Sequence, residues 1–118
     1  MVTSKSDKNK QQWKSGALVY SGRPDPSWEV ATEVAKSILT VWEGLDAWSG
    51  SIPMPPALGY RGCYLENDRG ERWNIYHDYV EHTSRGSTVI RRDNDRVCEK
   101  LILGTAPKGV LPPMTGKR

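Results

Sequence analysis

Residues 21–28, with the sequence SGRPDPSW, place the strongest local constraint on how this chain can fold. Pro24 and Pro26 fix their own φ angles, and each proline also pushes the residue before it out of the helical conformation. Gly22 gives the chain freedom to turn just before them. We therefore expect a stiff, extended bend in this segment.

The bend separates two predicted elements. Before it, residues 17–21 are expected to form a short strand. After it, residues 32–44 predict one amphipathic helix, because apolar residues recur at helical spacing over this range and Gly44 suits a helix end. The repeating apolar positions are Val34, Ile38, Val41 and Leu45.

The second half of the chain predicts a loop followed by strands. Residues 46–62, the Pro-rich loop, contain three prolines and three glycines and so cannot hold a regular ladder or helix. Alternating residues and turn signals then indicate strands over residues 63–66, 72–80 and 88–92, arranged as an antiparallel meander. A short helix is preferred over a strand for residues 96–103, with Arg96, Glu99 and Lys100 on its outer side.

These elements predict a single domain of the α+β class. At 118 residues, the chain is short for two hydrophobic cores. The expected fold is a short N-terminal strand, one amphipathic helix, a three-stranded antiparallel meander and a short C-terminal helix. Residues 17–106 form the predicted domain, and residues 1–16 and 107–118 are expected to be flexible tails.

Charge is distributed unevenly along the chain. The net charge of +3 comes from the two lysine-rich tails, whereas residues 17–106 hold ten basic and thirteen acidic residues. This balance argues against specific nucleic-acid binding by the domain. Non-specific binding of nucleic acid through the basic tails is one alternative function.

The sequence has no apolar run of the roughly 18 residues that a membrane helix needs, and residues 3–12 are polar, unlike a signal peptide. A cytoplasmic protein without membrane contact is therefore expected. Cys63 and Cys98 are expected to be reduced thiols, although a single bridge between them is not excluded by the sequence. No cofactor is expected.

Four short stretches give the chain a resemblance to known sequences. They are SGRPDPSW (21–28), LGYRG (58–62), the W-x-x-Y stretch from Trp73 to Tyr76, and LILGTAP (101–107). They are similar to a set of small proteins with an SGRPNP-type bend and an LGYRG-type strand start, although this chain has Asp25 where that set has Asn. The resemblance implies one compact unit and carries no activity.

The sequence contains few features that indicate catalysis. The sequence contains no P-loop, dinucleotide fingerprint, G-x-S-x-G motif or paired carboxylates, and neither cysteine lies in a nucleophile motif. His77, Asp78 and His82 form the densest polar group and suggest a small metal-dependent or acid–base enzyme as an alternative function. Positions four residues apart on a strand are about 13 Å apart, so no metal ligands are assigned there.

Two arginines next to glycine, Arg23 and Arg61, suggest a different site. If both guanidinium groups converge, they can hold a carboxylate or phosphate, with Tyr60 or Trp28 as a wall. The alternative is purely structural: Arg23 stabilises its own bend through Asp25, and Arg61 pairs with a nearby acid.

The preferred function is a small non-catalytic binding or interaction module. The Pro-rich loop is its contact surface, because a long loop in so small a domain is often functional. We expect its exposed residues to include Trp13, Trp48, Met54 and Tyr60. The predicted partner is another protein or a small anionic ligand.

Overall fold

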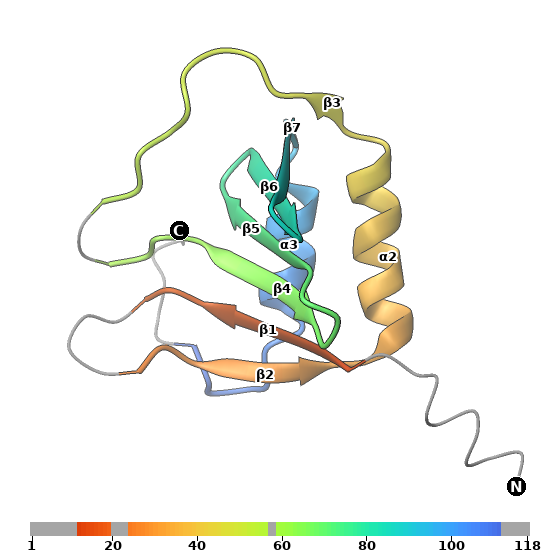
Figure 1. The fold of residues 1–118 in the computed structure, drawn as a ribbon. Coiled ribbons are helices and arrows are strands. Elements are labelled where there is room, and N and C mark those ends of the chain that lie inside the picture. The colour runs from red at the N-terminus through yellow and green to blue at the C-terminus, as the bar shows by residue number, and fades with distance from the viewer. Residues whose placement is uncertain (1–11, 20–23, 57–58, 112–118) are drawn as a thin grey trace, which may run out of the picture.

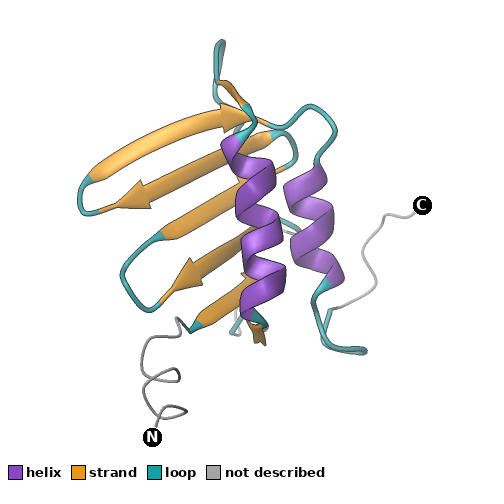
Figure 2. Cartoon of the chain, turned by 90° about the vertical axis from the view of Figure 1, so that its right-hand side faces the viewer, coloured by secondary structure: helices purple, strands orange, loops and turns teal. Residues whose placement is uncertain are grey.

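A computed structural model of the chain describes residues 12–19, 24–56 and 59–111 (Figure 1). Within these residues, seven strands form one antiparallel sheet in the order β2-β1-β4-β5-β6-β7-β3. Both helices lie on the same face of this sheet (Figure 2). The elements are β1 (Trp13–Ala17), β2 (Ser27–Val30), α2 (Thr32–Glu43), β3 (Asp46–Ala47), β4 (Cys63–Asn67), β5 (Arg72–Tyr76), β6 (Tyr79–Ser84), β7 (Ser87–Arg92) and α3 (Val97–Gly104).

The predicted fold class is wrong in its sheet. We expected a three-stranded meander and a separate short strand, whereas all seven strands belong to one sheet. The first error is at the N-terminus, where residues 13–16 were assigned to a tail. Trp13 and residues 15–17 are buried, and β1 pairs with both β2 and β4, so the chain enters the sheet at Trp13.

The bend between β1 and β2 is held by its own aspartate. Asp25 Oδ1 accepts a hydrogen bond of 2.8 Å from the Val19 backbone N–H, so the chain is tied across the bend. Of the described part of the predicted strand over residues 17–21, only Ala17 is in a strand, as the last residue of β1. Residues 20–23 lie outside the described residues.

The second error concerns residues 72–80, which we expected to be one strand. The chain turns at His77 and Asp78, so that Tyr76 of β5 pairs with Tyr79 of β6. His77 has a φ of 57° in this turn. Glycine usually occupies this left-handed conformation, and the sequence has no glycine here to indicate a turn. Because of this turn, the side chains after it alternate between the two faces of the sheet in a shifted phase. Val80, and not Tyr79, therefore joins Trp73 and Ile75 in the core.

The Pro-rich loop is shorter than expected at its start. Asp46 and Ala47 form β3, which pairs with Arg92 and Arg91 at the end of β7. The loop then runs from residue 48 to residue 62. Figure 1 shows its residues 48–56 leaving β3 beside the end of α2 and running to the left of the view, the side from which the chain enters β4.

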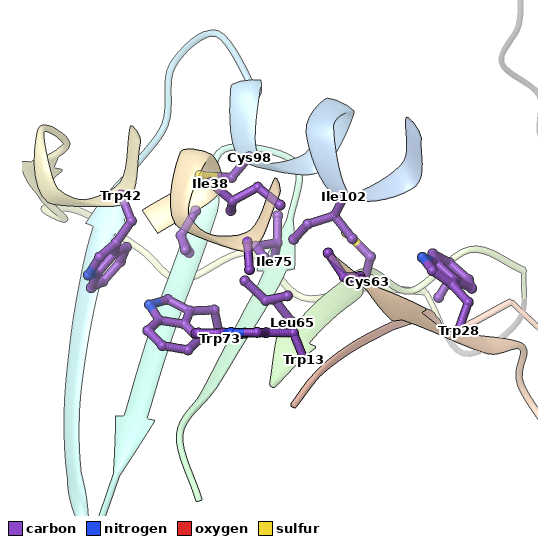
Figure 3. Close-up of a cluster of buried hydrophobic side chains, with 14 residues drawn as sticks. Trp13, Trp28, Ile38, Trp42, Cys63, Leu65, Trp73, Ile75, Cys98 and Ile102 are labelled. Carbon is purple, nitrogen blue, oxygen red and sulfur yellow. The ribbon is translucent and has the colours of Figure 1, made fainter. Parts of the chain in front are cut away.

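Both predicted helices are present, and they enclose the core against the sheet. Ala35, Ile38 and Trp42 of α2 and Cys98 and Ile102 of α3 are buried. Figure 3 shows Ile38, Trp42, Cys98 and Ile102 above the buried side chains of the sheet. Among the sheet residues, Trp13 and Trp73 lie with ring centroids 6.0 Å apart. Neither described helix is long and apolar enough to cross a membrane.

The start of β4 leaves no room for a side chain at Gly62. Gly62 has a φ of 120°, and an added Cβ would lie 2.6 Å from the Ile75 carbonyl oxygen. We predict that Gly62→Ala lowers the free energy of unfolding by about 3 kcal/mol or more, because it adds a backbone clash to an unfavourable φ. Urea denaturation measures this loss.

Gly70→Ala is the matched control. Gly70 also has a positive φ, of 88°, but an added Cβ there meets nothing within 4 Å. It is expected to cost about 1 kcal/mol, from backbone strain alone. Equal losses for the two variants would show that the contact with Ile75 is unimportant.

Candidate functional site

A cavity of about 210 Å³ lies between the Pro-rich loop and strands β4, β5 and β6. We call it the tyrosine pocket. Its sheet side includes Asn74, Tyr76 and Tyr79, and its loop side includes Ile52, Pro53 and Pro55. Trp73, Ile75 and Val80 are buried, so by strand alternation their neighbours Asn74, Tyr76 and Tyr79 point to the face opposite the helices.

The first end of the Pro-rich loop is fixed by Arg92. Its guanidinium group lies over the Trp48 ring, 4.0 Å from the centroid, and donates to the Ser49 carbonyl at 2.9 Å. It also pairs with Asp78 at 2.9 Å. Trp48 in turn meets Tyr79 edge to face, with centroids 5.4 Å apart. The loop therefore leaves β3 along a wall of the tyrosine pocket.

The last part of the loop is fixed by a buried carboxylate on α3. Glu99 is only 2% exposed. Its Oε2 accepts from the Tyr60 hydroxyl at 2.5 Å and from the His77 backbone N–H at 3.1 Å. Its Oε1 accepts from Arg96 Nε at 2.8 Å. Glu99 thus joins the loop, the β5–β6 turn and the start of α3.

Two of these donors are in left-handed backbone conformations. His77 has a φ of 57° and Arg96 has a φ of 56°. Such conformations are unfavourable for residues other than glycine and persist where surrounding contacts hold them. Because both residues donate to Glu99, the same carboxylate stabilises both strained positions.

Both thiols are buried and free. Burial raises the pKa of Cys63, and the interaction of this thiol with the Tyr60 hydroxyl offsets only part of this effect. Burial, with the nearby Asp93 carboxylate, raises the pKa of Cys98 to about 12. Burial also raises the pKa of Tyr60, and its neighbours Cys63 and Glu99 act in the same direction. At neutral pH all three groups keep their protons.

The predicted anion site is only partly described. Arg23 lies outside the described residues, so its convergence with Arg61 stays a prediction. Arg61 lies 3.7 Å from a carboxylate oxygen of Asp25. Of the two predicted walls, Tyr60 is bonded to Glu99, and Trp28 is buried against α3 with its Nε1 donating to Thr105 at 2.7 Å. Trp28 therefore belongs to the core.

The predicted contact residues differ in exposure. Trp13 is 5% exposed and packs in the core, contrary to the exposed position we expected. Trp48 and Tyr60 are half-buried at the two ends of the loop. Met54 is 86% exposed, and its neighbour Ile52 is 52% exposed. The exposed apolar surface of the loop is thus centred on Ile52 and Met54.

The alternative catalytic residues do not converge. The His77 ring stacks on Tyr76, with centroids 4.1 Å apart. Asp78 pairs with Arg92, and His82 stacks on Trp73 at 4.4 Å with its Nε2 3.2 Å from Glu71. In the described part of the chain, no group of three or more His, Cys, Asp or Glu residues could hold a metal ion.

Sequence reasoning missed the residues that shape the pocket. Glu99 was placed on the outer side of its helix because Arg96, Glu99 and Lys100 looked like a solvated face. One continuous strand over residues 72–80 would place Tyr79 on the same face as Trp73 and Ile75, whereas the β5–β6 turn moves it to the other face. The signal that could have located the turn is the pair His77-Asp78, two polar residues between Tyr76 and Tyr79.

Comparison with known proteins adds no relative. No family model, no curated protein and no solved structure matches this chain.

The donors around Glu99 lead to a stability prediction. Glu99→Gln should lower the free energy of unfolding by about 3 kcal/mol, because one amide NH₂ must then face groups that themselves donate. Tyr60→Phe, which removes one hydrogen bond, should cost about 1 kcal/mol. Chemical denaturation of each variant measures both losses.

The matched control for this charge removal is Glu66→Gln. Glu66 pairs with Arg72 at 2.9 Å, but both side chains are about one-third exposed. Water screens such a pair, so the expected change is within about 1 kcal/mol. Similar losses at Glu66 and Glu99 would contradict the role given to the buried carboxylate.

The raised pKa of Cys98 predicts a loss of stability in alkali. Above pH 9.0 the thiol ionises in the unfolded chain, whereas in the folded chain it keeps its proton until about pH 12. The unfolded state therefore binds fewer protons in this window, and the free energy of unfolding falls as the pH rises. The slope from this thiol is at most about 1.4 kcal/mol per pH unit.

Comparing the wild type with Cys98→Ala separates the effect of the Cys98 thiol on the free energy of unfolding from the effects of tyrosine and lysine titration. The variant should lose stability less steeply than the wild type between pH 9.0 and about 12 in urea denaturation. Parallel curves for the two proteins would refute the prediction.

Proposed function

We propose that this protein is a small non-catalytic interaction module. Its contact surface is the Pro-rich loop together with the tyrosine pocket beneath it. The observation that carries the proposal is the position of Ile52, an apolar residue that is 52% exposed and also lines the pocket. A partner that covers this loop removes apolar surface from water and reaches the pocket at the same time.

The size of the pocket suits one anchoring side chain. Small-molecule and cofactor sites usually enclose about 300–1,000 Å³. The tyrosine pocket, at about 210 Å³, is smaller than that range. Aromatic side chains that combine an apolar ring with a polar tip, as in Tyr76, Tyr79 and Trp48, are enriched where proteins meet.

The chemistry of the pocket supports binding over nucleophilic catalysis. A reactive cysteine needs a lowered pKa, whereas burial raises the pKa of Cys63, the thiol that lines this pocket. Arg61, which lines the pocket, is ion-paired with Asp25, and Arg92, the cross-strand partner of the pocket residue Tyr79, is ion-paired with Asp78. These pairs favour a protein partner over a small anionic ligand.

Indole, an uncharged aromatic molecule, is a suitable first probe of the pocket. In nitrogen-15 correlation spectra of the full chain, we expect indole at millimolar concentration to shift the amide signals of Ile52, Met54 and residues 74–79 in a saturable manner. Inorganic phosphate, added as a second probe, should leave these signals unchanged because Asp25 already lies at Arg61.

Two variants locate the binding. Ile52→Ser should weaken the indole shifts several-fold. Val89→Ser, at an equally accessible apolar residue of β7 (42% exposed), should not change them. If indole produces no saturable shifts, or shifts that both variants reduce equally, the proposed contact surface is wrong. Saturable shifts with phosphate would instead support the anionic ligand.

A further inference from the structure

The tyrosine pocket already has proline rings on one side. Pro53 and Pro55 of the loop line it opposite Tyr76 and Tyr79, which are cross-strand neighbours on β5 and β6. Grooves walled by aromatic side chains bind proline-rich segments in an extended polyproline II conformation, because the flat rings of proline fit against them. The chain's own prolines thus lie beside the tyrosine side chains of the pocket, and proline is the residue type that such aromatic surfaces bind.

The pocket also offers a hydrogen-bond donor for an extended peptide. A polyproline II segment makes no internal hydrogen bonds, so its carbonyl groups are available. Asn74 lies in the pocket lining, and its Oδ1 accepts from Arg72 Nε at 2.9 Å. That bond fixes the orientation of the side-chain amide and leaves Nδ2 as the group that can donate to a carbonyl oxygen.

Charge around the pocket favours an uncharged ligand. Arg61, Arg72 and Arg92 are each paired with a carboxylate, at 3.7, 2.9 and 2.9 Å from Asp25, Glu66 and Asp78. A phosphate or an acidic peptide would have to displace one of these carboxylates. Proline carries no charge, and its restricted φ lowers the entropy lost when a peptide is ordered on binding.

We propose that the partner segment is an uncharged, proline-containing peptide in an extended conformation. One proline ring enters the tyrosine pocket against Tyr76 and Tyr79, and Asn74 Nδ2 donates to a peptide carbonyl. This inference rests on the proposed function, since it names the kind of segment that the same surface binds.

The test uses the full chain and two synthetic peptides with blocked ends. One peptide is ten prolines long, and the other is an uncharged peptide of five Gly-Ser repeats. In nitrogen-15 correlation spectra, the proline peptide should shift the amide signals of Ile52, Met54 and residues 74–79, and these shifts should saturate. The Gly-Ser peptide, which is flexible and has no ring, should produce no saturable shifts at the same concentrations.

Variants test whether the proline peptide binds through Tyr79 and Asn74. Tyr79→Ala should weaken binding of the proline peptide about tenfold by removing one wall of the pocket. Asn74→Leu, which keeps a side chain of similar size but removes the donor, should weaken it several-fold. Val89→Ser on β7 is the control and should bind like the wild type. If Tyr79→Ala proves unfolded, Asn74→Leu together with Ile52→Ser carries the test.

The outcomes separate this inference from the proposed function. If indole binds at the pocket but the proline peptide does not, or binds no better than the Gly-Ser peptide, the inference is overturned and the interaction surface stands. If neither indole nor the proline peptide binds, both are overturned. Shifts by the proline peptide that survive Tyr79→Ala and Asn74→Leu in folded protein also overturn the inference.

Discussion

The buried carboxylate of Glu99 determines how three separate segments meet. It receives hydrogen bonds from the Pro-rich loop through Tyr60, from the β5–β6 turn through His77, and from the start of α3 through Arg96. A buried charge is tolerated only when such donors surround it, so the three segments cannot separate without exposing or stranding it. Because His77 lies between Tyr76 and Tyr79, the same carboxylate also sets the position of the pocket wall.

The two faces of the sheet differ in what covers them. The helices cover one face and enclose a core rich in tryptophan, where Trp13, Trp42 and Trp73 replace the phenylalanine that the chain lacks. On the other face, tyrosine rings lie beside polar residues under a loop fixed by Arg92 near its start and Glu99 near its end. The buried core and the tyrosine pocket thus lie on opposite sides of the same strands.

The parts of the fold that could be predicted depend on local signals. The apolar spacing around Ile38 defines α2, and the sequence Asn67-Asp68-Arg69-Gly70 marks the β4–β5 turn, because each signal lies within a few residues. The turn at His77 and the burial of Glu99 could not be predicted in this way. They are coupled by a hydrogen bond across 22 residues, and the one local signal of the turn is the polar pair His77-Asp78, which contains no glycine. Of the candidate site, the Pro-rich loop could be predicted from its prolines. The tyrosine side of the pocket could not, because its position depends on the turn at His77.

The order of strands in the sheet has a consequence for biosynthesis. β1 pairs with β4, and the whole of β2, α2, β3 and the Pro-rich loop separates them in the chain, whereas β4 to β7 pair consecutively. A ribosome therefore releases the β1–β2 hairpin and α2 well before the strand that joins them to the rest. The local meander can form early, but closing the large loop between β1 and β4 is the slow, entropically costly step. Until it occurs, Trp13 and Trp28, both buried in the finished fold, lack part of their final cover.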